Sequence, residues 1–178
     1  IVLCDWSSDV CSSDLDYNGA MLMRIDNDLT PKVIQCDIQG HNGLAFSPDK
    51  RWMFTSDTPN GVIYRTQLDE QGEPGKREEF RRFSEGDGIP DGAAMDEEGC
   101  YWSALFDGWR IARFSPQGEQ LEEYRLPVRC PTMVCFGGDD MKTLFITTTR
   151  ENMEAEELAK YPLSGAIFTL PVNVAGMK

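Results

Sequence analysis

The residue of this chain best placed to do chemistry is Asp91, in the stretch GIPDGAAM at residues 88–95. Proline fixes the backbone on one side of this acid, and glycine frees it on the other. A carboxylate in such a place can bind a hard cation or accept a proton. Taken alone, however, Pro-Asp-Gly is a common turn sequence and favours a structural role. The elements around Asp91 therefore decide between the two interpretations.

Asp91 stands at the mouth of a strand-turn-strand unit that occurs three times. A short apolar strand, an acidic turn with glycine and a second, aromatic strand follow it. Related units begin at Asn42, 49 residues before Asp91, and at Thr132, 41 residues after it. A period of roughly 40 to 50 residues with several short strands predicts β-propeller blades. Because equivalent positions of successive blades line one central channel, we expect Asn42 and Asp91 to lie at the same end of it.

The repeat predicts an all-β fold, a partial propeller domain over residues 16–178 with about three and a half blades. The outer half of one blade covers 20–36, full blades cover 41–83 and 91–126, and a third from 132 to 171 lacks its outer strand. Asn152 is expected to cap a short helix over 153–160, which we interpret as a solvated insertion in a connecting loop.

Residues 1–15 do not share the pattern of the repeat. Residues 4–15, CDWSSDVCSSDL, resemble one reading frame of a common sequencing-adapter oligonucleotide. We therefore predict that residues 1–15 are an artefactual leader outside the fold. On this prediction the natural sequence starts near Asp16, within a gene, and the true N-terminus is missing.

The chain is acidic, with 30 Asp and Glu against 17 Lys and Arg and a net charge of −13. The leader holds three aspartates and no basic residue, so −10 remains without it. This charge argues against nucleic acid and membranes as partners, and no apolar run is long enough to span a membrane. The cysteines outside the leader form no C-x-x-C pair, which favours small buried thiols in a reducing, cytoplasmic compartment over zinc or disulfides; they are Cys36, Cys100, Cys130 and Cys135.

Four stretches carry a resemblance to a known family: HNGLAFSPD at 41–49, IPDGAAMDEEGCYWSA at 89–104, RIARFSPQGE at 110–119 and RCPTMVCFGGDDMKTLFITTTR at 129–150. They resemble successive blades of the regucalcin, or senescence marker protein, family of gluconolactonase-like sugar lactonases. The likeness covers nearly everything from Ala20 to Gly176, and N-G-L paired with P-D-G at this spacing is more specific than either motif alone. The resemblance implies a six-bladed propeller with one divalent cation in its channel.

The resemblance also implies the roles of the site residues. In the family the asparagine of N-G-L and the aspartate of P-D-G are metal ligands, which assigns Asn42 and Asp91 to the metal. The family's third ligand, a glutamate, and its substrate-contacting arginine and asparagine lie upstream of the matched region. Oxygen ligands suit calcium, magnesium or manganese and can also hold zinc.

The implied reaction is hydrolysis of a small-molecule sugar lactone, in which the cation polarises the carbonyl attacked by water. Asp91 is the expected catalytic residue. We rank it as a metal ligand first and a general base second, because a carboxylate bound to a cation is a weaker base than its reference pKa of about 3.9 implies.

Two functions from different classes follow. The first is metal-dependent lactone hydrolysis by the intact parent protein, with this chain impaired because upstream ligands and blades are missing. The alternative is a non-catalytic propeller that binds a cation or another ligand. Asn42 and Asp91 on one channel favour the enzyme. His41 could also face the channel, but a single histidine beside a turn is more often structural.

Overall fold

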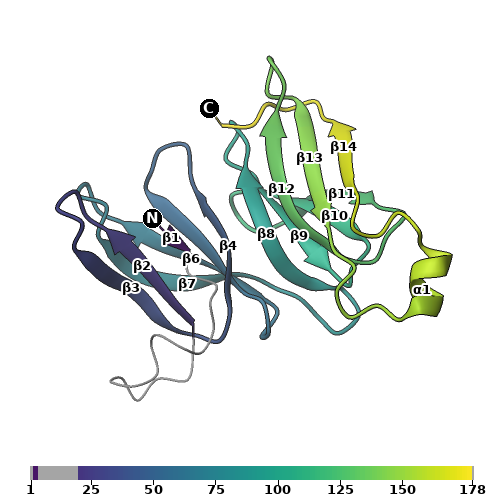
Figure 1. Ribbon diagram of the computed structural model, residues 1–178. Coiled ribbons are helices and arrows are strands. Elements are labelled where there is room, and N and C mark those ends of the chain that lie inside the picture. Colours follow the sequence, from purple (N-terminus) through teal and green to yellow (C-terminus); the bar gives the residue numbers. More distant parts are fainter. Residues whose placement is uncertain (1, 4–19, 178) are drawn as a thin grey trace.

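The computed structural model describes residues 2–3 and 20–177, which form four antiparallel sheets (Figure 1). Sheet 1 contains β1 (Val2–Leu3), β2 (Ala20–Ile25) and β3 (Pro31–Ile38). Sheet 2 contains β4 (His41–Phe46), β5 (Trp52–Asp57), β6 (Val62–Leu68) and β7 (Pro74–Arg82). Sheet 3 contains β8 (Ile89–Met95), β9 (Tyr101–Phe106), β10 (Arg110–Phe114) and β11 (Gln120–Arg125). Sheet 4 contains β12 (Pro131–Gly137), β13 (Thr143–Thr148) and β14 (Ile167–Pro171).

Within each sheet, every strand pairs with the next strand in the chain. This up-and-down order is that of a propeller blade. The first strands of sheets 2, 3 and 4 are neighbours, since β4 contacts β8 and β8 contacts β12 (Figure 1). The predicted all-β propeller architecture is confirmed, with sheets 2 and 3 as four-stranded blades and sheets 1 and 4 as three-stranded ones.

Two apolar layers hold sheets 2, 3 and 4 together, and β9 contributes to both. Successive side chains of a strand point to opposite faces. Tyr101 and Leu105 of β9 accordingly pack toward sheet 2, where they meet Phe54. Trp102 and Ala104 face the other way, into the layer shared with sheet 4. Because both faces are covered, β9 is an almost wholly buried strand in the middle of the described domain.

The insertion between β13 and β14 is helical, but it begins later than predicted. Helix α1 spans Ala155–Lys160, and Glu154 takes the N-cap position without a side-chain cap bond. Asn152 has a φ of 56°, whereas a capping residue has an extended backbone. The predicted cap at Asn152 is therefore wrong, because that asparagine completes the turn that precedes the helix.

Two further details qualify the sequence predictions. Cys100 and Cys130 are buried thiols as expected, and Cys36 is partly buried, but Cys135 is exposed on β12. All four are free cysteines. No described helix has the length and hydropathy of a membrane-spanning segment.

Most of the predicted leader, residues 4–15, lies outside the described residues. Val2 and Leu3 pair with Met23 and Leu22 of β2. The boundary at residues 15 and 16 stays a prediction.

Candidate functional site

The structure brings Asn42 and Asp91 together although 49 residues separate them in the sequence. Asn42 is the second residue of β4 and Asp91 the third residue of β8. The Nδ2 atom of Asn42 donates a hydrogen bond to Oδ1 of Asp91, and both side chains are partly buried. Two polar groups near the starts of neighbouring inner strands thus converge on one point.

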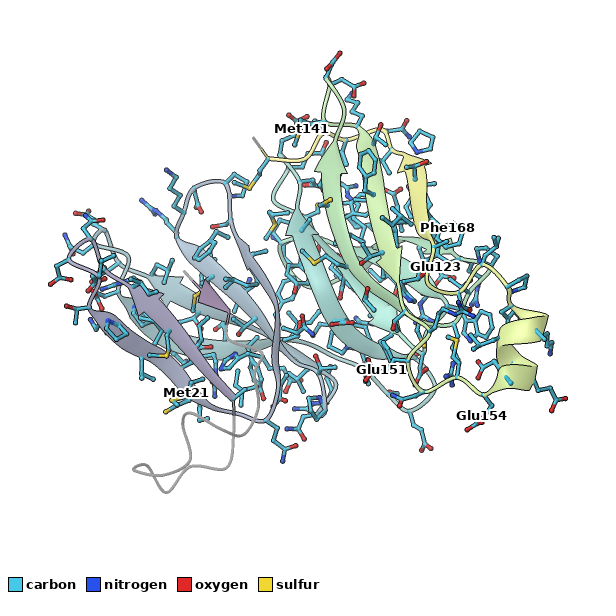
Figure 2. The ribbon with its side chains drawn as sticks, viewed as in Figure 1. Met21, Glu123, Met141, Glu151, Glu154 and Phe168 are labelled. Atoms are coloured by element: carbon cyan, nitrogen blue, oxygen red, sulfur yellow. The ribbon has the colours of Figure 1, made fainter. Side chains whose placement is uncertain are left out.

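These residues lie at the end of the blades where the inner strands begin. In sheet 4 the start of β12 pairs with the end of β13, since Pro131 opposes Thr148. Figure 2 shows Glu151, just past β13, at this end, and Met141, in the turn between β12 and β13, at the opposite end. We call the two ends the inner-strand entrance and the opposite end.

The inner strands β4, β8 and β12 each carry a β-bulge at the inner-strand entrance. The pairing register shifts between Asn42 and Ala45 in β4, between Pro90 and Ala93 in β8, and between Pro131 and Met133 in β12. A bulge adds an unpaired residue, bends the strand and redirects a side chain, and bulges are common beside active sites. The three predicted site positions therefore each lie beside a bulge. The sequence did not reveal these bulges.

The glycines that follow the two polar residues allow close packing, each in its own way. Gly43 has a φ of 56°, and a Cβ there would lie 2.3 Å from Oη of Tyr101. Gly92 does not have a left-handed backbone, contrary to the expectation that it frees the chain; a Cβ there would lie 2.6 Å from the carbonyl oxygen of Thr132. Gly92 is thus needed for the approach of β8 to β12.

Tyr101 contacts the residue that follows Asn42 and was not singled out from the sequence. Its hydroxyl donates to the carbonyl oxygen of Gly43 at 2.6 Å, and Oγ of Ser56 lies 3.5 Å from it. Burial raises the pKa of Tyr101, and the charge of Asp91 raises it further. The hydroxyl therefore stays neutral and remains a donor at neutral pH. An aromatic residue in a core strand gives no sequence signal for such a role.

The donor set of the pair fits a hard divalent cation. Asp91 offers carboxylate oxygen. Asn42 offers Oδ1 of the same amide group whose Nδ2 donates to Asp91. That Oδ1 accepts from the backbone N–H of Gly43 at 3.1 Å, which leaves it a second lone pair. Calcium and magnesium take ligands of these two types.

A second acidic cluster lies beyond the far end of β8. Ligand atoms of Asp96, Glu98 and Cys100 lie within 4.8 Å of one another, a spacing that could hold a metal. The group is at the opposite end, because Asp96 pairs with Gly176 and the N–H of Gly176 donates to Met141.

A positively charged side chain of the protein already pairs with the carboxylates of this second cluster. The guanidinium of Arg113 lies 2.8 Å from Asp96, 2.6 Å from Glu98 and 2.9 Å from Glu122. Asp96 also accepts from the indole of Trp102 at 2.9 Å and from the backbone N–H of Cys100 at 2.8 Å. Burial lowers the pKa of Arg113, but its hydrogen bonds to Glu98 and Asp96 outweigh burial and raise that pKa above its ordinary value. We therefore interpret the cluster as a buried structural ion-pair network.

His41 is a buried neighbour of the site. It is 6% exposed, and neither ring nitrogen has a hydrogen-bond partner within the described part of the chain. Burial lowers the pKa of His41, and the nearby charge of Asp57 opposes this effect. In the β4–β5 ladder His41 pairs with Asp57, the last residue of β5.

Comparison with known proteins gives a consistent result. Residues 7–150 match the family model described as the SMP-30/Gluconolactonase/LRE-like region. A 6-deoxy-6-sulfogluconolactonase of Pseudomonas putida is 56% identical over 162 residues, which are 90% of this chain and 56% of that protein. A pentonolactonase of Haloferax volcanii is 30% identical over 90% of this chain and 57% of its own length.

Solved structures agree with the fold. A regucalcin from Agrobacterium tumefaciens, described as a calcium-binding protein, superposes with a TM-score of 0.85 at 27% identity, over 91% of this chain and 55% of the other. A gluconolactonase from Xanthomonas campestris superposes with a TM-score of 0.68 over 92% of this chain and 48% of its own. The chain thus spans about half the length of the relatives that it matches.

Proposed function

Because the chain belongs to the SMP-30/gluconolactonase/LRE-like family, we propose that it forms part of an enzyme that hydrolyses a sugar lactone at one divalent cation held by Asn42 and Asp91. The observation that carries this proposal is the contact between the two side chains at the bulges of β4 and β8. A carboxylate beside an amide supports a ligand role, because both groups offer oxygen atoms of the kind that a hard cation takes.

The substrate class is proposed from the relatives. The proteins of Pseudomonas putida and Haloferax volcanii are named for two different sugar lactones, a sulfogluconolactone and a pentonolactone. Their common feature is a cyclic ester of a polyhydroxy acid. We therefore propose a sugar lactone as the substrate. The sulfonated lactone is the first to test, because the Pseudomonas putida enzyme named for it is 56% identical to this chain.

Calcium is the first cation to test, because the regucalcin with the same fold is described as calcium-binding. Magnesium, manganese and zinc also accept oxygen ligands. When bound, such a cation would polarise the lactone carbonyl and stabilise the charge on its oxygen.

The residues of the chain would do the remaining work. Asp91 would accept the proton of the attacking water whose oxygen bonds to the carbonyl carbon. The ring C–O bond then breaks, and its oxygen takes a proton to become a hydroxyl. Asn42 orients Asp91 through their hydrogen bond, and Thr58 holds the preceding residue by donating to the carbonyl oxygen of Pro90 at 2.7 Å. These contacts fix the carboxylate before substrate arrives.

Acid release at constant pH tests the proposal. The assay uses gluconolactone and its 6-sulfo analogue, with calcium or manganese, on this chain and on the same chain joined to the upstream part of its gene. We expect Asp91→Ala and Asn42→Ala to lower Mn²⁺ affinity and hydrolysis together, by about 100-fold or more for Asp91→Ala, because one ion serves both. Asp139→Ala, an exposed acid at the opposite end, is the matched control and should behave like the parent.

Two outcomes would contradict the proposal. Hydrolysis by Asp91→Ala at the parent rate would show that this carboxylate takes no part in the reaction. Tight cation binding without hydrolysis of any lactone by the extended chain would favour the non-catalytic binding protein.

A further inference from the structure

We propose that Tyr101 is a positioning residue of the cation site, whose buried hydroxyl holds the β4 bulge in the shape that directs Asn42 at Asp91. The inference rests on the proposed function, since it concerns the same two side chains. It adds a residue from β9 to a site whose two proposed ligands come from β4 and β8.

The contact joins two blades through buried atoms. Tyr101 is fully buried in sheet 3, and its hydroxyl donates to the carbonyl oxygen of Gly43 in sheet 2 at 2.6 Å. Gly43 lies inside the register shift between Asn42 and Ala45, where the β4–β5 ladder is interrupted. A carbonyl in a bulge needs a partner from outside the ladder, and Tyr101 supplies one.

Three hydrogen bonds in sequence connect Tyr101 with Asp91. The first is the bond from Tyr101 to the carbonyl of Gly43. The second runs from the N–H of Gly43 to Oδ1 of Asn42 at 3.1 Å, and the third from Nδ2 of Asn42 to Oδ1 of Asp91. A shift of the Gly43 peptide would therefore move the amide that meets the carboxylate.

Close packing leaves this peptide little freedom. A Cβ at Gly43 would lie 2.1 Å from Oγ of Ser56 and 2.3 Å from Oη of Tyr101, and Gly43 has a left-handed φ of 56°. The two hydroxyls thus fill the space that a side chain would occupy. Ser56 lies 3.5 Å from the phenol oxygen and is itself fully buried, so it limits where that oxygen can move.

The test compares Tyr101→Phe with Tyr124→Phe. Each variant removes one hydroxyl, from the fully buried ring of Tyr101 or from the partly buried ring of Tyr124. The hydroxyl of Tyr124 lies away from the site and donates to Glu122 in the Arg113 network at 2.5 Å. Free Mn²⁺ is measured by electron paramagnetic resonance, and the melting temperature of each variant by calorimetry. Groups that orient metal ligands typically change affinity 10- to 100-fold, and we expect a loss of about that size in Tyr101→Phe and less than twofold in Tyr124→Phe.

The outcomes separate this inference from the proposed function. If neither the parent chain nor the chain joined to the upstream part of its gene binds Mn²⁺, the cation site itself is wrong. If the parent binds Mn²⁺ and Tyr101→Phe binds it equally well, the positioning role is wrong even if the melting temperature falls, because a purely structural hydroxyl would change stability alone.

A second measurement covers the case in which Tyr101→Phe fails to fold. In the parent chain labelled with ¹⁵N and ¹³C, titration with calcium should shift the amide signal of Gly43 and the ring signals of Tyr101. The ring signals of Tyr124 should stay unchanged. Shifts at Asn42 and Asp91 without any at Gly43 and Tyr101 would overturn the proposal.

Discussion

Asp91 and Asp96 lie on and just beyond the same strand, yet the structure surrounds them differently. Asp96 is completely buried and accepts from Arg113, Trp102 and two backbone N–H groups. Asp91 is only partly buried and meets the amide of Asn42 from the next blade. A carboxylate neutralised by a guanidinium serves stability, whereas one placed beside another oxygen-bearing side chain suits a cation. The two ends of β8 thus carry an acid in a structural ion-pair network and the acid that we propose as a metal ligand.

The largest expected effect on stability comes from Asp96→Ala. This change leaves the nearly buried guanidinium of Arg113 without its most buried partner and removes the acceptor of the Trp102 indole. Breaking a buried ion pair on one side typically costs about 3–5 kcal/mol of unfolding free energy. Asp91→Ala should cost about 1 kcal/mol, as a typical substitution does. Urea denaturation of both variants measures the difference, and equal losses would remove the distinction between the two acids.

A smaller effect is expected for Glu98→Gln within the same network. Glu98 pairs with Arg113 at 2.6 Å, but its side chain is 63% exposed. Water screens such pairs, so the loss of unfolding free energy should be about 1 kcal/mol or less. Mn²⁺ affinity should not change, because Arg113 occupies the cluster. A large drop in Mn²⁺ affinity would instead identify the group of Asp96, Glu98 and Cys100 as a metal site.

The smallest expected effect concerns the ionisation of Tyr101 and Tyr124, the tyrosines that lie near Asp91 and Asp96. Burial raises the pKa of Tyr101, and burial together with the bond to Glu122 raises the pKa of Tyr124 to about 12. Since both phenols lie above the ordinary value of about 10, the stability from their neutral hydroxyls is complete below pH 10 and is lost as pH rises through the folded values. Ultraviolet titration should show both phenols ionising above pH 10, and Tyr124→Phe should remove the step near pH 12. Ionisation of either phenol at the ordinary value of about 10 would contradict this.

Much of the fold follows from local patterns. Alternating apolar residues and glycine-rich turns predict the strands from Ala20 to Pro171, and the recurrence of the unit predicts the blades. The helix after β13 was predicted with the wrong start, because a capping asparagine and a turn asparagine are the same residue type and differ in backbone angle. Local composition therefore gives elements reliably and their ends less so.

The candidate site was predictable in part. Repeat spacing aligns Asn42 with Asp91, and a propeller places such positions side by side. The bulges that aim them were not visible, because a bulge depends on the register between two strands and not on the residue alone.

The sequence by itself determined which residues recur at the blade entrances and so which side chains are candidates. Tertiary structure alone decided that the Tyr101 hydroxyl meets the carbonyl oxygen of Gly43, the residue after Asn42, and that Asp96 pairs with Arg113, 17 residues away. It also decided that Gly92 is required by the closeness of β12 and not by its own backbone angle. The physical reason is that a carboxylate or a hydroxyl takes its role from the charges and donors packed around it, and these come from strands distant in sequence.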